Sequence, residues 1–536
     1  MKKSAVRISS IALAIVALFA AAVYAQTTPP AGSPVARHGH LRVEGHRIVD
    51  KDGNPVQLRG MSLFWSISRG SRSFYNADAV RHIASDWQAT VVRAAMGVNR
   101  NWAGDEQGFL TGDPTNRDRV ITVVDAAIAA GIYVIIDWHA YQAEYQQAEA
   151  VAFFEDMATR YGKEPNIIYE IYNEPICDRP QDPVQPASNW NVSAQCAAGV
   201  SDAQFWSTKL KPYMQAVTNA IRARGSDNVI ILGTPRWCQR PDVAAADPIN
   251  GINLAYSLHF YANSPDHRDR LRENAARAML QSGQAIFASE FGTVNADGGG
   301  AHNAAETDIW MDFMDQFHIG WANWALHASS QTSAALTSGQ ANQPSGWNLS
   351  PSGTYIRNRL RTPRKATPTF FTVKVNTSGQ GEVAVDPQKL LFKSGETVSL
   401  VALANTGGGW SFAGWSGAGL TGNNMITTLT ITGDVDVTAR FTHPTISVQY
   451  KDGTPGITRW SVKQAGGGLT VVGPSGSSAD VALYDVRGKI VRKFSVSGGT
   501  ATAINNAKIP AGNYFVVVRD RATGRETYKS RVTMVN

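Results

Sequence analysis

The sequence predicts an α/β protein: a (β/α)8 barrel, also called a TIM barrel, followed by two small all-β sandwich-like modules. Two observations carry this prediction. From residue 37 to 361, short apolar runs alternate with amphipathic segments of helical period, the pattern of βα units around a parallel sheet. After Arg361 the helical period disappears, and short β-rich runs separated by Gly and Asn turns replace it.

The N-terminal 25 residues have the features of a secretory signal peptide. Lys2, Lys3 and Arg7 precede an apolar run that ends in Val23-Tyr24-Ala25, so we expect cleavage after Ala25. Retention of this apolar run as a membrane anchor is the alternative. No later segment is apolar enough to span a membrane. The sequence therefore predicts a secreted protein, extracellular or at the cell surface, in which residues 26–36 form a short linker of turn-forming residues.

Eight apolar runs between residues 37 and 361 are strand candidates, and amphipathic segments such as "NADAVRHIASDW" lie between them. An open doubly wound sheet would need a Gly-rich phosphate loop after its first strand, and "RGMSLFWS" is not one. Eight parallel strands in one region instead favour a closed barrel. The candidate strands are "QLRGMSL" from 57, "TVVRAAM" from 90, "YVIIDWH" from 133, "IIYEIYNE" from 167, "VIILGTP" from 229, "NLAYSLHFY" from 253, "AIFASEFG" from 285 and "GWANWAL" from 320.

The part of the chain after the predicted barrel divides into three pieces. Residues 362–370 form a Pro- and Thr-containing linker, residues 371–442 a first β-rich module, and residues 445–536 a second. The formal charge is +7, but residues 445–536 hold 13 Lys and Arg against 5 Asp and Glu. The predicted barrel has no comparable basic stripe, so nucleic acid is not expected as its ligand.

Three cysteines, Cys177, Cys196 and Cys238, are too few for a disulfide-built scaffold. They lack the paired spacing of a zinc site, and we expect no metal. One bridge with one leftover thiol is the expectation, and the pairing stays open.

Polar and aromatic residues stand where the predicted strands end, which in a barrel of this kind is where active sites lie. Each such buried polar group costs stability unless it is paired, so their accumulation at one rim indicates a site. They are Arg93, Asp137, His139, Asn173, Glu174, Trp237, His259, Tyr261, Glu290 and Trp324.

These residue types suit glycoside hydrolysis, which needs one carboxyl group to protonate the leaving oxygen and a second, ionised, to attack the anomeric carbon. Glu174 and Glu290 are the two candidates, on strands four and seven. Aromatic rings suit the C–H faces of sugars, and five tryptophans are expected at or near the rim: Trp65, Trp102, Trp138, Trp237 and Trp324.

Residues 39–360 carry, in order, the motifs "LRGMS", "VVRAAMG", "VIIDWH", "IYEIYNEP", "GTPRW", "YSLHFYA", "IFASEFGT" and "ANWAL". In these motifs the chain resembles glycoside hydrolase family 5, in particular bacterial endo-β-1,4-glucanases. The resemblance implies Glu174 as acid/base and Glu290 as nucleophile of a retaining enzyme that binds β-glucan and needs no metal or organic cofactor. It implies sugar contacts from Arg93, His139, Asn173, His259, Tyr261 and Trp324, and we expect Trp237 to bind substrate as well.

Other activities stay open at this point. Phe64 and Trp65 follow "GMS" where many relatives have a histidine, and Ser329 and Gln331 stand where the family often has a lysine and a glutamate. A mannanase, lichenase or xyloglucanase, or a glucan-binding protein without activity, are therefore the alternatives. The first downstream module resembles a bacterial secreted β-repeat through "FAGWSG". The last resembles a type IX secretion sorting domain through "LYDVRGKIV", so cell-surface attachment is a further expectation.

Overall fold

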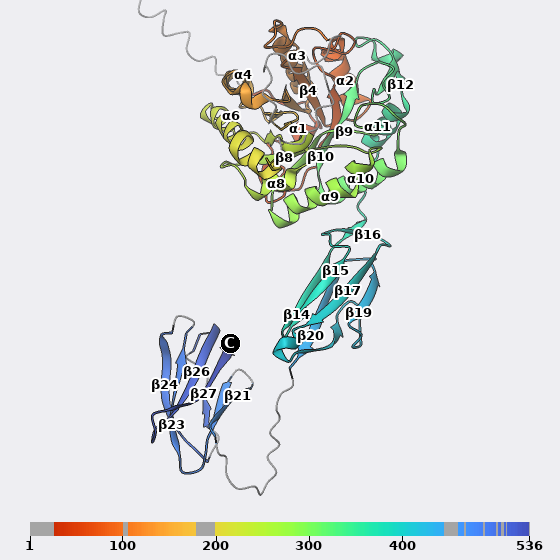
Figure 1. Ribbon diagram of the computed structural model, residues 1–536. Coiled ribbons are helices and arrows are strands. Elements are labelled where there is room, and N and C mark those ends of the chain that lie inside the picture. Colours follow the sequence, from red (N-terminus) through yellow and green to blue (C-terminus); the bar gives the residue numbers. More distant parts are fainter. Residues whose placement is uncertain are drawn as a thin grey trace, which may run out of the picture. The chain divides into compact units, whose positions relative to one another are not determined.

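Eight parallel strands form a closed barrel in the computed structural model of the chain, ringed by helices (Figure 1). Neighbouring strands follow the order β10-β3-β4-β5-β6-β7-β8-β9. This confirms the predicted fold class, because each apolar run found in the sequence forms one strand of the barrel. The strands are β3 (Arg59–Leu63), β4 (Val91–Gly97), β5 (Tyr133–His139), β6 (Ile167–Glu170), β7 (Ile230–Leu232), β8 (Leu254–Tyr261), β9 (Ala285–Gly292) and β10 (Gly320–Leu326).

The helices form because apolar residues recur at helical spacing and pack onto the outer faces of the strands. Local signals set their ends: Asn76 caps the first of them by accepting from the Ala79 N–H. They are α2 (Ala77–Ser85), α3 (Thr115–Ala130), α4 (Gln147–Tyr161), α5 (Asp202–Phe205), α6 (Lys211–Ala223), α7 (Pro235–Cys238), α8 (Pro241–Ala246), α9 (Asp269–Ala276), α10 (Ala304–Phe317) and α11 (Pro351–Arg361).

The N-terminal end of the barrel is closed by a short helix α1 (Pro34–His38) and a hairpin of β1 (Arg42–Glu44) and β2 (Arg47–Val49). Apolar side chains from this cap, including Val35, Leu41 and Ile48, join the strand residues that fill the barrel interior. Because apolar side chains fill this end, the polar side chains of the strands gather at the opposite, C-terminal end of the barrel.

The structure describes residues 26–99, 105–177, 199–443, 459–465, 468–485, 488–499, 502–504, 509–510 and 512–534. The predicted signal peptide, Trp102 and Cys196 lie outside these ranges. None of the helices within them has both the length and the apolar character that a membrane crossing requires.

Residues 370–442 form an all-β module of two three-stranded sheets, joined by a small pair of β13 (Phe370–Phe371) and β16 (Phe392–Lys393). Its core contains Trp415 of the "FAGWSG" motif. One sheet holds β14 (Val373–Ser378), β20 (Val435–Thr442) and β18 (Ser411–Ser416), and the other holds β15 (Gly381–Asp386), β17 (Thr397–Ala404) and β19 (Ile426–Thr430).

Residues 444–536 form a separate compact unit, also all-β, with a core that includes Trp460. Small all-β sheets after the barrel are what the sequence predicted. One sheet is β21 (Ser461–Ala465), β22 (Gly468–Val472) and β25 (Thr502–Ile504), and the other is β24 (Ile490–Ser497), β23 (Ser478–Tyr484), β26 (Gly512–Asp520) and β27 (Glu526–Met534).

Candidate active site

Eight of the predicted site residues lie together at the C-terminal end of the barrel, and none is more than 8% exposed. A charge at this depth needs a partner, so the contacts between these side chains define the chemistry. Arg93 lies in β4, His139 ends β5, Asn173 and Glu174 follow β6, His259 and Tyr261 lie in β8, Glu290 in β9, and Trp324 in β10.

The segment that carries Glu174 is not part of the regular strand, contrary to the sequence prediction. Strand β6 ends at Glu170, and the chain then bends toward β5, where the Asn173 N–H donates to the Trp138 carbonyl at 3.2 Å. The Glu174 N–H donates to the Ala140 carbonyl, also at 3.2 Å. These two bonds take the place of regular strand pairing between β5 and β6. They fix the side chains of Asn173 and Glu174 at the C-terminal end of the barrel.

Glu290 is held by two donors. Arg93 Nη1 donates to Oε2 at 3.0 Å, and the Tyr261 hydroxyl donates to Oε1 at 2.7 Å. A guanidinium cannot accept a hydrogen bond, so Oε2 of Glu290 is the acceptor of the first bond, and Oε1 accepts the second from the Tyr261 hydroxyl.

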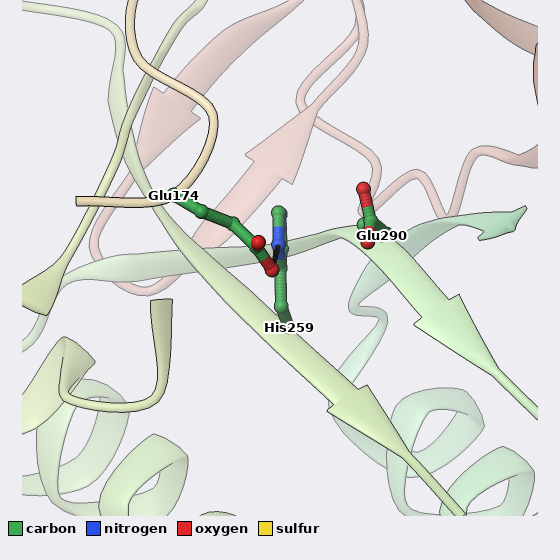
Figure 2. A group of neighbouring side chains, drawn as sticks. All are labelled: Glu174, His259 and Glu290. Atoms are coloured by element: carbon green, nitrogen blue, oxygen red, sulfur yellow. Dashed lines mark hydrogen bonds and ion pairs between the residues drawn. The ribbon is translucent and has the colours of Figure 1, made fainter. Parts of the chain in front are cut away.

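Glu174 is held by His259, whose Nδ1 lies 2.9 Å from Oε1 (Figure 2). Burial would lower the pKa of His259, but its contacts with Glu170 and Glu174 outweigh burial and raise that pKa to about 9. The ring is therefore an imidazolium at neutral pH, and it donates to Glu174. Its Nε2 lies 3.0 Å from the Ser289 hydroxyl.

Arg93 is the centre of the charged network and is fully buried. Besides Glu290, its guanidinium contacts Glu170 at 2.6 Å and Asp137 at 2.9 Å. It also donates to the Asn173 carbonyl oxygen Oδ1 at 2.6 Å. This last bond fixes the amide orientation, so that Nδ2, a buried donor with no hydrogen-bond partner among the described residues, is left for a ligand.

His139 complements this donor with an acceptor. Its Nδ1 lies 2.7 Å from Asp137 Oδ2, while burial and the charge of Arg93 lower the pKa of the ring to about 3. The neutral ring therefore donates from Nδ1. Its buried Nε2, which has no hydrogen-bond partner among the described residues, is left as an acceptor.

Aromatic rings line the site beside these polar groups. Trp324 stacks on His139 with 5.4 Å between ring centroids and 7° between planes. Phe64 lies 4.9 Å from Trp324 and 5.0 Å from Trp65, between centroids. Rings of this kind offer apolar faces to a sugar.

Trp237 lies in a different setting, a turn of left-handed backbone in α7. Arg236, Trp237 and Cys238 have φ values of 57°, 51° and 58°, a conformation that costs about 1–2 kcal/mol per non-glycine residue. The turn is tied to the segment around Glu174, because the Trp237 N–H donates to the Pro175 carbonyl at 3.2 Å. Its side chain is half-buried.

Trp138 does not line the site, so the expectation that it lies at or near the rim was wrong. Its side chain points outward from β5 and packs against Phe153, with 5.4 Å between ring centroids.

Cys177 is disulfide-bonded and Cys238 is a buried free thiol, which confirms one bridge and one leftover thiol.

Sequence reasoning missed Glu170, a fully buried carboxylate that contacts Arg93 and His259. The signal was present in the run "YEIYNE", where a second glutamate stands four residues before Glu174. Burial of an acid within an apolar run of the sequence is rare unless it has a charged partner.

One oxygen or nitrogen from each of Glu174, His259 and Glu290 lies within 4.8 Å of the other two. A metal ion would need the imidazole nitrogen free of its proton. The raised pKa of His259 and the adjacent Arg93 guanidinium oppose that, so this cluster is better suited to an organic ligand than to a cation.

Two carboxyl groups facing each other at the C-terminal end of a (β/α)8 barrel, beside aromatic rings and free polar groups, define a glycoside hydrolase. The comparison with protein families agrees: the family described as cellulase (glycosyl hydrolase family 5) matches residues 49–330. The chain belongs to this family. A second match, to a divergent InlB B-repeat domain, covers residues 371–445.

Relatives of the barrel are found among bacterial enzymes. Endoglucanase Z of Dickeya dadantii is 42% identical over 328 residues, which cover 61% of this chain and 67% of that protein. A solved structure from Cytophaga hutchinsonii is 38% identical with a TM-score of 0.53, covering 61% of this chain and 96% of that one. The catalytic domain of Thermobifida fusca endoglucanase Cel5A is 31% identical with a TM-score of 0.51, covering 62% and 100%.

Proposed function

We propose that this glycoside hydrolase cleaves internal β-1,4-glucosidic bonds of cellulose-type glucans with retention of configuration. The observation that carries the mechanism is the pairing of Glu174 and Glu290, which have a carboxylate oxygen each within 4.8 Å of the other. Carboxyl groups about 5 Å apart favour direct attack by one of them, because no water fits between them and the sugar. The endoglucanase relatives support the choice of substrate.

Glu290 is the proposed nucleophile. Its carboxylate attacks the anomeric carbon, the bond to the glycosidic oxygen breaks, and Glu174 gives its proton to that departing oxygen. Arg93 and Tyr261 hold Glu290 by both oxygens and set its angle of attack.

Glu174 is the proposed acid/base. In the second step it takes a proton from water while the water oxygen attacks the anomeric carbon, and Glu290 leaves as a carboxylate. Each step inverts the anomeric centre, so the product keeps the β-configuration. The unpaired Nδ2 of Asn173 is placed to donate to the sugar 2-hydroxyl.

Release of reducing sugar from carboxymethyl cellulose, mannan, lichenan and xyloglucan, measured in parallel, tests the substrate. We expect the highest rate on carboxymethyl cellulose, with a rapid fall in viscosity that indicates internal cleavage. A preference for mannan or xyloglucan would replace the glucanase assignment by another glycanase, and no release from any polymer would overturn it.

Rescue by azide tests the two roles. Glu290→Ala and Glu174→Ala should each lose several orders of magnitude in rate, since each removes a group that acts on the reacting atoms. Azide should restore Glu290→Ala with an α-glycosyl azide as product, and Glu174→Ala, on an activated aryl glycoside, with a β-glycosyl azide. Exchanged products would exchange the two roles, and release of an α-anomer by the unaltered enzyme would refute retention.

We also propose that the protein is exported and that the C-terminal unit contributes to surface attachment. Support comes from the signal-peptide features of residues 1–25 and from the excess of basic residues after Thr445. N-terminal sequencing of the exported protein should give Gln26 as the first residue, and cell fractionation of a chain that ends at His443 should move activity from the surface to the medium. Cell-associated activity in that shorter chain would contradict the attachment role.

A further inference from the structure

Glu170 is a carboxylate whose place in the site the paired-glutamate mechanism does not explain. It ends β6, its side chain is 0% exposed, and it is one of the four acidic groups packed around Arg93 and His259. Burial of a carboxylate at this depth is costly unless its partners are charged and close.

Its two contacts lead to both proposed catalytic groups. On one side Glu170 Oε2 accepts from Arg93 Nε at 2.6 Å, and the same guanidinium donates to Glu290. On the other side Oε1 lies 3.7 Å from His259 Nε2, and the opposite nitrogen of that ring contacts Glu174 at 2.9 Å. Glu170 is therefore one residue removed from the nucleophile and one removed from the acid/base.

We propose that Glu170 is a positioning residue that keeps His259 in its charged, donating form and holds Arg93 in register with Glu290. The proposal rests on the proposed function for its kinetic consequences, but not for its effect on the His259 ring. In this proposal the single buried charge of Glu170 positions both proposed catalytic groups, Glu290 through Arg93 and Glu174 through His259.

The electrostatics of the two partners agree with this role. Burial would raise the pKa of Glu170, but the charge of Arg93 and the contact with His259 lower it to about 2. The same contact is the first among those that raise the pKa of His259 to about 9 against burial. Charged or titratable groups that face this pair are Arg93 from β4, Asp137 and His139 from β5, Glu174 after β6, Cys238 from α7 and Glu290 from β9, with the hydroxyl of Ser289 on Nε2.

The isosteric substitution Glu170→Gln removes the charge but keeps the shape and an acceptor for Arg93. Without that charge, Glu174 and Glu290 alone oppose the effect of burial, and the pKa of His259 should fall well below about 9. Between pH 5.5 and pH 8 the kcat/KM of the variant should then fall as His259 loses its proton, whereas the unaltered enzyme, whose ring has a pKa of about 9, should stay nearly level. A pKa lowered all the way to the ordinary value of about 6.5 would correspond to a loss of about 30-fold.

Glu164→Gln is the matched control. Glu164 is also a buried glutamate, three residues before β6, and it accepts from Thr27 rather than from the site. A role in stability alone would make the two variants alike: both would lower the melting temperature and neither would change the shape of the pH profile.

The experiment combines NMR titration of the histidine rings, with His259→Asn used for assignment, and pH profiles on soluble glucan. A His259 pKa that stays near 9 in Glu170→Gln would overturn the proposal, whatever the activity. If Glu170→Gln does not fold, Glu170→Asp tests the same point: retracting the carboxylate by one methylene should lower the His259 pKa by a smaller amount, and an unchanged value would overturn the proposal. The two proposals can fail separately. If the unaltered protein has no glucanase activity but the His259 pKa still falls in Glu170→Gln, the proposed function is refuted and the role of Glu170 toward His259 stands.

Discussion

At the scale of single residues, the charges of this site decide which imidazoles are protonated, and burial alone does not. His259 and His327 are both almost fully buried. His259 faces carboxylates and its pKa rises to about 9, whereas His327 stacks on Phe64 at 4.3 Å and burial lowers its pKa to about 4. The pKa values of these two buried imidazoles are therefore shifted in opposite directions, upward for His259 and downward for His327.

The pKa of His327 predicts an acid-sensitive contribution to stability. The unfolded chain takes up the proton first, near pH 6.5, so the contribution is full above pH 6.5 and is lost as the pH falls toward 4. The loss should amount to about 3 kcal/mol. In His327→Phe, which keeps an aromatic ring against Phe64, the free energy of unfolding in urea should fall less steeply between pH 6.5 and pH 4.

His327→Gln serves as the control, because it lacks the titrating group but not the polarity. Both variants should have the same shallow pH slope even if their stabilities at pH 7 differ. A slope as steep as that of the unaltered protein in either variant would show that His327 is not the group responsible.

Sequence reasoning located the polar residues of the site but not all of their partners. Period-two alternation along a strand identifies Arg93, His259 and Glu290 as inward residues at strand ends. It gives no partner for Glu170, because the contact with Arg93 joins β6 to β4, 77 positions apart. Trp138 was misplaced because aromatic content was weighed without that alternation.

At the scale of elements, apolar runs were sufficient to find all eight barrel strands, since parallel strands buried on both faces read as continuous apolar segments. Strand length was harder to predict: the "IIYEIYNE" run suggested a strand to Glu174, whereas β6 ends at Glu170. The left-handed turn at Arg236–Cys238 has no sequence signal, because none of these residues is a glycine. It depends on tertiary bonds such as Cys238 Sγ to the Asn173 carbonyl, 3.0 Å.

The helix ends offer a matched pair of substitutions. Helices α3 and α10 both end in a left-handed residue, which is Gly131 (φ 68°) after α3 but His318 (φ 57°) after α10. A side chain in this conformation costs about 1–2 kcal/mol, and His318 also buries an Nδ1 with no hydrogen-bond partner among the described residues. His318→Gly should therefore stabilise the protein by about 1 kcal/mol, allowing for the added freedom of the unfolded chain.

Gly131→Ala is the opposite test. A Cβ there would lie 2.3 Å from the Ser33 hydroxyl oxygen as well as adopt the strained conformation. In urea unfolding, the free energy of unfolding should be lower for Gly131→Ala, and higher for His318→Gly, than for the unaltered protein. A destabilised His318→Gly would mean that the imidazole makes a contact that outweighs its backbone strain.

At the scale of the whole molecule, the first all-β module is joined to the barrel by more than a linker. Phe370, the last residue of the predicted 362–370 linker, is 4% exposed and packs on Phe313 of α10 with 5.3 Å between ring centroids. Gln316 bonds to the backbone of Phe370 through both amide atoms. Glu273 of α9 accepts from the Leu390 N–H at 3.0 Å. The site itself draws on none of these residues.

Two truncations separate the contribution of this contact to stability from any contribution to catalysis. A chain ending at Arg364 loses Phe370 and Leu391 from the core that they share with the barrel, whereas a chain ending at His443 keeps both. Burial of such a side chain contributes about 1.5–3 kcal/mol, so the shorter chain should melt several degrees lower than the longer one.

Both should hydrolyse carboxymethyl cellulose at close to the full-length rate at 25 °C, because every residue of the site lies between β3 and β10. Equal melting temperatures would mean that the module contributes nothing to the barrel. A shorter chain that stays folded by circular dichroism but loses activity would mean that the barrel is not an independent catalytic domain.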